Sequence, residues 1–351
     1  MPYEPLPKPM PVVQPGEFIF AASHLDHGHI HGMCSGLIEA GGEVRYVYDT
    51  DPARAADFCK RYPTARVVDS FDRLLEIDEI KLVVSAGVPS ERGPTGCRVM
   101  EAGKDYFVDK APFTSLAQLE TARKIATATG QIYAVYYCER TASESGIFAG
   151  QLIDQGAIGR VVQVAGFGPH KLNAPSRPAW FFERAKYGGI LCDIGSHQAE
   201  QILTYTGATD AKVGHAAVAN YNAKAYPELE DFGEASLILN NGASGYFRVD
   251  WFTPAGLGTW GDGRTIIMGT KGYIELRKVL DIGHSAEGEH VFLVDDKDQH
   301  HFPVKGKVGC PYFGQLILDC LNRTEKAMAQ SHTFKAAEIS LRCQEVAVRL
   351  E

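Results

Sequence analysis

The sequence lacks the features that mark several large protein classes. Its eight cysteines include no C-x-x-C pair, and a chain of 351 residues does not need a disulfide framework. No apolar stretch is long enough to span a bilayer, and the N-terminus has no basic segment followed by an apolar one, as a signal peptide would. We therefore expect reduced thiols and a cytoplasmic protein.

An excess of positive charge is also missing. The chain has 35 lysines and arginines against 43 acidic residues, so its net charge is −8. Nucleic acids and anionic membranes would repel such a chain on average. The 45% hydrophobic content allows a large core, and the length favours two domains. We expect a small-molecule partner, and neither a nucleic acid nor a membrane.

Proline is concentrated at the N-terminus, where it occupies six of the first fifteen positions. This density disfavours helix and sheet and favours extended polyproline-type structure. Residues 1–16 are therefore predicted to be either a disordered tail or an arm that lies across a neighbouring subunit. The arm is plausible because a stiff segment loses little entropy when it docks.

Residues 17–139 alternate between short β-branched or aromatic runs and helix-length segments. One helix is expected at 51–62, with Asp51 as its cap and Pro52 in its first turn, and another at 115–130. The expected strands are 18–22, 43–49, 81–86, 105–109 and 131–138. This alternation predicts an α/β domain with a doubly wound parallel sheet.

The pattern changes in residues 140–351. After a helix near 144–156 come longer alternating strands at 160–167, 233–252 and 264–276. Asn240-Asn241-Gly242 has the composition of a hairpin turn. A second, α+β domain with a predominantly antiparallel sheet is predicted.

Four histidines lie within eight positions in the stretch AASHLDHGHIHG, residues 21–32, directly after the first expected strand. In a doubly wound sheet this turn faces the pyrophosphate of a dinucleotide. The fingerprint G-x-G-x-x-G, placed on residues 26–31, keeps only its middle glycine, Gly28. We interpret the stretch as an atypical phosphate loop. The candidate cofactor contacts here and at a later strand end are Gly28, His29, Ile30, Ala86 and Gly87.

Asp49 ends the second expected strand, 21 residues after Gly28. An acid at this place accepts hydrogen bonds from the ribose hydroxyls of an adenosine and repels a 2′-phosphate. The sequence therefore predicts NAD(H) in preference to NADP(H). The alternative is that Asp49 caps the next helix, although Asp51 is better placed for that cap.

The histidines also allow a different class of protein. His27-Gly28-His29 and His29-Ile30-His31 have the H-x-H spacing of metal-dependent hydrolases, whose site would use the cluster His24–His31. Such a site needs further histidines and a carboxylate from later strand ends. The later strands do not offer that full set, so no metal is expected.

Two further stretches indicate redox chemistry. Lys110 follows a strand in FVDKAP, and Asp193 and His197 are four residues apart in GGILCDIGSHQ, so they share a helical face. Hydride transfer from an alcohol needs a base for the hydroxyl proton and a group that holds the oxygen, which His197 and Lys110 would supply. A structural alternative is that Asp193 and His197 only brace their helix.

At this point the sequence resembles the Gfo/Idh/MocA family, the glucose-fructose oxidoreductases and inositol dehydrogenases, over most of residues 17–345. The resemblance rests on EVRYVYDTDPARAADFCKRYP, EAGKDYFVDKAP, GAIGRVVQV, GGILCDIGSHQAEQ and GTKGYIEL. It implies a Rossmann domain and a second domain whose open sheet buries one face in a homodimer or homotetramer. It also implies that Lys110 contacts nicotinamide and substrate, Asp193 binds substrate, His197 is the general acid/base, and Trp180 lies at the cofactor.

Some positions depart from the family pattern or have no counterpart in it. Residue 111 is alanine, so a cis-prolyl bond cannot follow Lys110 directly. Arg92 stands where many relatives have histidine, and we expect it to be a surface helix residue rather than a cofactor contact. His170 is a candidate substrate contact, with a plain loop histidine as the alternative.

These patterns predict an NAD(H)-dependent oxidoreductase that oxidises a secondary hydroxyl of a sugar, cyclitol or related polyol. One alternative is oxidation followed by elimination, which cleaves a glycoside and recycles the cofactor. A third possibility is a non-catalytic sensor of NAD or sugar, although a sensor would not need Lys110, Asp193 and His197 together.

Overall fold

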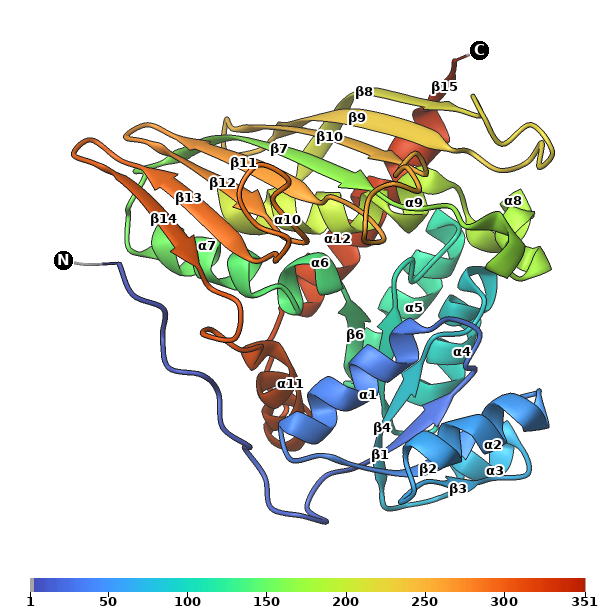
Figure 1. The fold of residues 1–351 in the computed structure, drawn as a ribbon. Helices are drawn as coiled ribbons and strands as arrows, with labels where there is room; N and C mark the ends of the chain where they lie inside the picture. The colour runs from blue at the N-terminus through green and yellow to red at the C-terminus, as the bar shows by residue number, and fades with distance from the viewer. Residues whose placement is uncertain (1–2, 351) are drawn as a thin grey trace. The chain divides into compact units, whose positions relative to one another are not determined.

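The computed structural model describes residues 3–350, and the chain folds into two compact units (Figure 1). The first, called here the Rossmann unit, comprises Pro9–Tyr136 and Pro311–Phe334. The second unit comprises residues 3–8, Tyr137–Cys310 and residues 335–350. Of the N-terminal arm expected at 1–16, residues 1 and 2 lie outside the described part, as does residue 351 of the expected second domain.

The Rossmann unit is built on a six-stranded sheet in which every strand pairing is parallel, with the order β3-β2-β1-β4-β5-β6. All residues of β1 and β5 are buried, as expected for a sheet covered on both faces. The predicted doubly wound sheet is thus confirmed. The strands are β1 (Ile19–Ser23), β2 (Glu43–Tyr48), β3 (Arg66–Val67), β4 (Ile80–Ser85), β5 (Asp105–Asp109) and β6 (Tyr133–Tyr136).

Several helices of this unit begin where the sequence has capping residues. Asp51 accepts a hydrogen bond from the Ala53 amide at the start of α2, and Ser115 caps α5, which ends at Gly130. The helices that lie wholly within the unit are α1 (His29–Glu39), α2 (Pro52–Arg61), α3 (Phe71–Leu75), α4 (Pro89–Glu101), α5 (Leu116–Thr129) and α11 (Pro311–Asn322).

Helix α11 joins the Rossmann unit from far along the sequence, in a region that the sequence assigned to the second domain. Arg323, just after α11, forms an ion pair with the buried Asp105 of β5. The Tyr312 hydroxyl donates to the Val135 carbonyl of β6 at 3.4 Å. These contacts, which sequence periodicity does not reveal, attach residues 311–334 to the parallel sheet.

The second unit contains a nine-stranded mixed sheet with the order β14-β13-β12-β11-β7-β10-β9-β8-β15. Only β10 with β7 and β15 with β8 pair in parallel, so the prediction of a mostly antiparallel sheet is confirmed, and β9 and β10 form the expected hairpin. The strands are β7 (Val161–Pro169), β8 (Ala211–Ala219), β9 (Phe232–Leu239), β10 (Ser244–Asp250), β11 (Arg264–Gly269), β12 (Tyr273–Arg277), β13 (His290–Val294), β14 (Gln299–Pro303) and β15 (Val348–Arg349).

Helix α10 packs closely on this sheet. A Cβ atom built at Gly245 of β10 would lie 2.8 Å from Cγ2 of Ile202, so the glycine allows the helix to approach the strand closely. The remaining helices are α6 (Cys138–Thr141), α7 (Glu144–Asp154), α8 (Arg184–Tyr187), α9 (Ile190–Asp193), α10 (Gly195–Thr206) and α12 (Gln330–Val346), with 3-10 turns at Ala174–Ser176 and Ala179–Phe182.

The proline-rich segment lies against its own chain and contains no helix or strand in residues 3–16. The Tyr3 hydroxyl donates to Asp295 of the second unit at 3.0 Å, and the Leu6 amide donates to Gln151 of α7 at 3.1 Å. Further along, the Val12 amide donates to the Ala40 carbonyl at the end of α1, in the Rossmann unit, at 2.9 Å. The described part of the segment is therefore attached to its own chain at several points.

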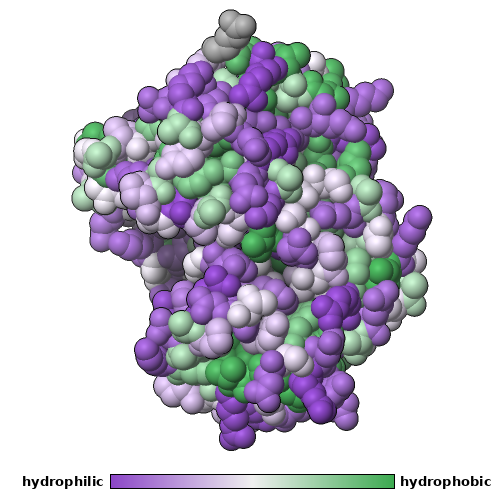
Figure 2. Space-filling view, turned by 90° about the vertical axis from the view of Figure 1, so that its right-hand side faces the viewer, coloured by the Kyte–Doolittle hydropathy of each residue, from purple (hydrophilic) through white to green (hydrophobic). Residues whose placement is uncertain are grey.

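Hydrophilic residues dominate the face seen in Figure 2, with hydrophobic residues in separate groups. Among the described residues, no helix has both the length and the apolar character that crossing a membrane requires.

Candidate active site

The loops after β1 and β4 lie against each other at the carboxyl edge of the parallel sheet. The Ala86 amide donates to the His24 carbonyl at 3.1 Å, and a Cβ atom at Gly87 would lie 2.9 Å from the Cβ of His24, which explains the glycine. The strand order reverses between β1 and β4, and in doubly wound sheets this reversal marks the ligand crevice. The predicted residues Ala86 and Gly87 therefore lie at this edge of the sheet.

Gly28 occupies the N-cap of α1, at the end of the turn that joins β1 to α1. Its φ of −63° does not require glycine, and a Cβ atom there would meet nothing within 4 Å. The first turn of α1 has no acidic residue. These features suit a phosphate group, because helix N-termini attract anions. The Ile30 side chain is buried in the core, and the Ile30 amide donates to the His27 carbonyl at 3.3 Å, so the structure does not support Ile30 as a phosphate contact.

The Asp49 carboxylate is fully engaged by its own unit. It accepts hydrogen bonds from the Leu25 amide at 2.6 Å, the Asp51 amide at 2.7 Å and the Arg54 guanidinium at 2.7 Å. The Asp49 side chain is 0% exposed, whereas Arg54 is 38% exposed and also pairs with Asp26 at 3.1 Å. Arg54, which sequence reasoning missed, thus brings a positive charge to the place where a ribose is expected.

Arg92 is not a surface residue, contrary to our expectation, because it is 1% exposed and lies beneath the β5 turn. Its guanidinium donates to Asp109 Oδ2 at 3.1 Å, to the Gly87 carbonyl at 2.7 Å and to the Lys110 carbonyl. The buried carboxylate of Asp109 supplies the counter-charge that allows an arginine to be buried here. Arg92 therefore links the loop after β4 to the loop after β5.

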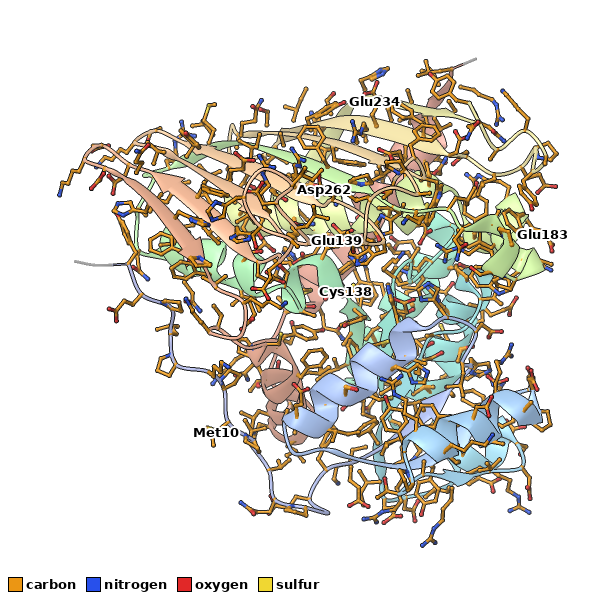
Figure 3. The ribbon with its side chains drawn as sticks, in the orientation of Figure 1. Met10, Cys138, Glu139, Glu183, Glu234 and Asp262 are labelled. Carbon is orange, nitrogen blue, oxygen red and sulfur yellow. The ribbon has the colours of Figure 1, made fainter. Side chains whose placement is uncertain are left out.

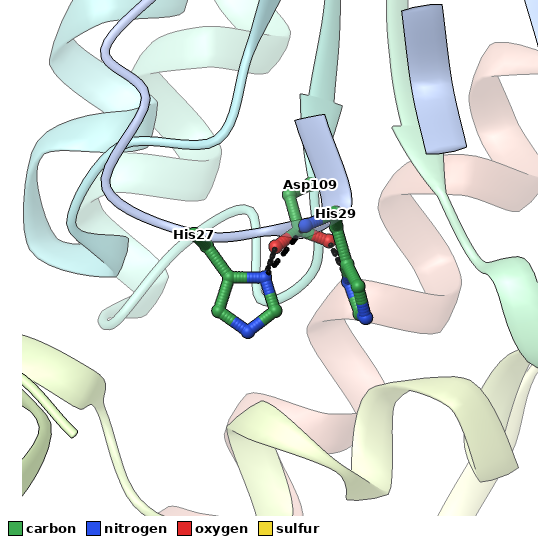
Figure 4. A group of neighbouring side chains, drawn as sticks. All are labelled: His27, His29 and Asp109. Carbon is green, nitrogen blue, oxygen red and sulfur yellow. Dashed lines mark hydrogen bonds and ion pairs between the residues drawn. The ribbon is translucent and has the colours of Figure 1, made fainter. Parts of the chain in front are cut away.

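Two of the four clustered histidines meet Asp109 (Figure 4). His29 Nδ1 lies 2.8 Å from Asp109 Oδ1, and His27 Nδ1 lies 3.2 Å from Oδ2. The pKa of His27 is lowered to about 4, chiefly by burial and also by the neighbouring His29 and Lys110, while Asp109 opposes the shift. Despite its burial, Asp109 has a pKa well below its ordinary value, because His29, Arg92 and His27 stabilise the carboxylate.

The other two histidines lie elsewhere. The His24 ring contacts the rings of Tyr48 and Phe71, and the His31 ring stacks on Phe58 and Tyr62. His24 and His31 therefore do not join the other two histidines in one site. The donor atoms of His27, His29 and Asp109 lie within 4.8 Å of one another, so the H-x-H pair that meets a strand-end carboxylate is His27 and His29.

Lys110 directly follows β5 and is buried, since the residue is only 5% exposed. Its carbonyl oxygen accepts a hydrogen bond from Arg92. The Lys110–Ala111 peptide bond is cis, even though residue 111 is not proline. The positive charge of Lys110 acts on His27, which places its ammonium group near the histidine loop.

Asp193 and His197 lie at the junction of α9 and α10 in the second unit. Only Ile194 separates the two helices, so the two side chains are about one helical turn apart, and both are buried. The Ser196 hydroxyl donates to the Asp193 carbonyl at 2.9 Å, which ties the two helices together. The sequence predicted this proximity from the four-residue spacing.

Several polar side chains lie near His197 beside α6, where Figure 3 labels Cys138 and Glu139. His197 Nε2 lies 3.8 Å from Cys138 Sγ. Glu139 Oε2 accepts from Gln198 at 2.7 Å and lies 3.6 Å from Lys278 Nζ. Burial lowers the pKa of Lys278, while the charge of Glu139 opposes that shift. Glu139 could have been suspected from its place at a strand end, but nothing in the sequence connects Lys278 to it.

The remaining candidates come from the segment after β7. His170 packs against Trp251 and Trp260, and its Nε2 lies 4.0 Å from Glu139 Oε1. Arg177 stacks over Trp251, and its charge interacts with that of Asp193, although burial lowers its pKa. Trp180 is half-buried beside Phe181.

Comparison with known proteins identifies both parts of the chain. The model of the oxidoreductase family with an NAD-binding Rossmann fold matches residues 19–137, and that of the GFO/IDH/MocA C-terminal domain matches residues 148–275. A solved chain from Erwinia carotovora atroseptica SCRI1043, described only in general terms as an oxidoreductase, is 44% identical. The alignment covers 95% of this chain and 100% of that one, with a TM-score of 0.93.

Two further relatives have named activities. The scyllo-inositol 2-dehydrogenase (NAD(+)) of Bacillus subtilis (strain 168) is 28% identical over 253 residues, 70% of each chain. An aldose-aldose oxidoreductase from Caulobacter crescentus, solved with glycerol, is 18% identical, with a TM-score of 0.78 over 94% of this chain and 97% of that one. At this identity the second likeness shows the fold alone. Together, the two family matches show that this chain belongs to the Gfo/Idh/MocA family of NAD-binding oxidoreductases.

Proposed function

We propose that the protein oxidises a secondary hydroxyl of a sugar, cyclitol or related polyol with NAD⁺. When bound, NAD⁺ accepts the hydride from the carbinol carbon at C4 of its nicotinamide. His197 takes the hydroxyl proton at Nε2, and Lys110 holds the oxygen as negative charge develops on it. The products are a ketone, NADH and a proton, so the reaction balances and is reversible.

The observation that carries this proposal is that Asp193 and His197 lie about one helical turn apart at the α9–α10 junction. Both side chains are buried, and the Arg177 charge acts on Asp193. A carboxylate, an imidazole and a guanidinium together can hold several hydroxyl groups of a polyol at once. The name of the Bacillus subtilis relative supports a cyclitol among the candidate substrates. The segment that carries His170 and Trp180 is the expected source of further contacts to substrate and cofactor.

For the cofactor, NAD(H) remains the preferred choice over NADP(H). This choice rests on Asp49 at the end of β2, because an acid at that position of a Rossmann sheet would repel a 2′-phosphate. The charge of Arg54, 2.7 Å from Asp49, works in the opposite direction and is expected to reduce the preference.

The substrate is testable with a panel of cyclitols, aldoses, sugar acids and glycosides, each incubated with NAD⁺ and with NADP⁺. NADH formation at 340 nm with at least one polyol is expected. If none of the compounds gives reduced cofactor or a thermal shift, the proposal is wrong.

Oxidation followed by elimination is a second candidate, favoured by the pairing of Glu139 with His170. Such a reaction needs a base for the hydrogen next to the new ketone, and a carboxylate 4.0 Å from an imidazole would serve. Glycosides cleaved at catalytic NAD⁺, without NADH accumulation, would establish this reaction. A stoichiometric yield of NADH with the glycoside intact would exclude it.

We also propose a homodimer or homotetramer formed through the sheet of the second unit. Met268 of β11 and Tyr273 of β12 are register partners, and both are exposed. The same row continues through Gln163 of β7 and Ser244 of β10 to the exposed Ile238 of β9. A second copy would remove the three apolar side chains of this row from water. None of the eight cysteines, all of which the structure describes, forms a disulfide, which is consistent with the reducing environment of the cytoplasm, where we expect the enzyme to act.

A further inference from the structure

The contact between His29 and Asp109 is explained neither by the family matches nor by the roles proposed for Lys110 and His197. Asp109 is 0% exposed, and its carboxylate lies 3.1 Å from the Arg92 guanidinium. A buried carboxylate with an arginine partner stays ionised, and an ionised carboxylate can only accept hydrogen bonds. The 2.8 Å contact from His29 Nδ1 to Asp109 Oδ1 therefore requires a proton on Nδ1.

This requirement determines what His29 offers to a ligand. A neutral imidazole carries one proton, so with Nδ1 protonated, Nε2 has a free lone pair. No described residue forms a hydrogen bond with His29 Nε2, and the side chain is 33% exposed. His29 is thus held with an acceptor nitrogen that can be reached from solvent.

His27 completes the arrangement around the carboxylate. Its Nδ1 lies 3.2 Å from Asp109 Oδ2 and 3.3 Å from the His29 amide. His27 Nδ1 cannot at the same time donate a hydrogen bond to Asp109 and accept one from the His29 amide. Donation to the buried charge is the stronger interaction, so His27 also presents Nε2 as an acceptor. The two rings are nearly perpendicular, with their centroids 4.3 Å apart.

Charge decides which kind of ligand fits. Arg92 and Lys110 bring two positive charges to a group with a single carboxylate, which disfavours a divalent cation. An anionic phosphate oxygen would meet the lone pair of Nε2 and be repelled. A hydroxyl group, which donates a hydrogen bond and carries no charge, satisfies the lone pair without either penalty.

We propose that His29, oriented by Asp109, binds a ligand hydroxyl by accepting its hydrogen bond at Nε2, with His27 as the second acceptor for an adjacent hydroxyl. The ligand chemistry is a vicinal diol, as in the ribose of the dinucleotide or in a polyol substrate. The second of these ligands, a polyol substrate, rests on the proposed function. Asp109 is a positioning residue in this account, because it acts on the ligand only through the histidines.

The protonation state of His29 is directly measurable. Long-range ¹H–¹⁵N correlation spectra of untagged, [¹⁵N]histidine-labelled protein distinguish the two neutral tautomers, and the His29→Ala spectrum identifies the His29 signals. The Nδ1–H form is expected, and Asp109→Asn is expected to shift His29 toward the Nε2–H form. An Nε2–H tautomer in the wild-type protein would overturn the proposal.

Ligand binding then separates the two sources of the diol. If the ribose is bound, His29→Ala weakens NAD⁺ binding about five- to tenfold in calorimetry, and NAD⁺ alone moves the His29 Nε2 signal. If a polyol is bound, NAD⁺ affinity is unchanged and a mixture of scyllo-inositol, D-xylose and glycerol moves that signal. His31→Ala, in the same helix but away from Asp109, is the control and should change neither.

Two results would contradict the inference. One is an Nε2 signal and an NAD⁺ affinity that respond to none of these ligands. The other is one equivalent of tightly bound metal in wild-type protein that is lost in His27→Ala and His29→Ala. Neither readout needs turnover, so a failure here is distinct from failure of the substrate panel, which concerns the proposed function alone.

Discussion

Arg92 Nη2 lies 3.1 Å from Asp109 Oδ2, and both side chains are almost completely excluded from solvent. This ion pair joins α4 to the end of β5. Through Asp109 it also holds His27 and His29, which follow β1. The conformation of the loop after β5, and hence of Lys110, depends on it, because the same guanidinium also holds the Lys110 carbonyl.

Replacing Arg92 should therefore destabilise the protein strongly. Arg92→Ala leaves a buried carboxylate without its cation, which costs about 3–5 kcal/mol. Urea denaturation would measure the loss. The control Arg73→Ala removes an exposed arginine paired with Glu76 on α3 and should cost less than about 1 kcal/mol. Equal stability of the two variants would show that the buried pair is not important.

His27 should make stability depend on pH. Its folded pKa is about 4, below the ordinary value near 6.5, so between these pH values the unfolded chain binds a proton that the folded protein excludes. Stability should fall as the pH drops from 6.5 to 4, by on the order of 2–3 kcal/mol from this group. Melting temperatures of His27→Ala should decline less over that range. Parallel curves for wild type and variant would contradict the assignment.

Arg54 should decide how strongly the enzyme discriminates between the two dinucleotides. We expect wild-type protein to bind NAD⁺ more tightly than NADP⁺ because of Asp49. Arg54→Ala removes the charge that would attract a 2′-phosphate, so NADP⁺ affinity should fall about tenfold while NAD⁺ affinity changes less. Fluorescence titration would test this, with Arg61→Ala at the other end of α2 as control. Tighter binding of NADP⁺ than of NAD⁺ by the wild type would refute the role of Asp49.

The exposed row of the second sheet should control oligomerisation. Met268→Asp places a charge next to Tyr273 in this row and should convert the oligomer into monomers, as measured by light scattering after size-exclusion chromatography. Ile282→Asp adds the same charge at an exposed position outside the row and should leave the mass unchanged. A wild-type monomer, or an oligomer that tolerates Met268→Asp, would rule out this interface.

The sequence predicted those features that depend on local pattern. The strand and helix alternation of the first domain, the Asp51 cap and the Asn240-Asn241-Gly242 hairpin all follow from short-range propensities. The closeness of Asp193 and His197 follows from helical spacing. These predictions needed no knowledge of distant contacts.

Features that depend on long-range pairing were missed or wrong. Arg92, on α4, was predicted to be a surface residue because its counter-charge, Asp109, lies on another element, β5. Lys278 reaches Glu139 only through the folding of the second unit. Helix α11 belongs to the first unit although, along the sequence, it follows all strands of the second sheet except β15. The four clustered histidines divide into two pairs for the same reason. The neighbouring strands, and not the local sequence, determine which imidazole rings contact Asp109.

The central claim is that His197 takes the proton while a hydride leaves the substrate. The most direct test is the rate of NADH formation at saturating NAD⁺ with the polyol found in the panel, in wild type, His197→Ala and Lys110→Ala. The account predicts that each substitution lowers kcat about 10²- to 10⁴-fold. A near-wild-type kcat in His197→Ala would contradict it.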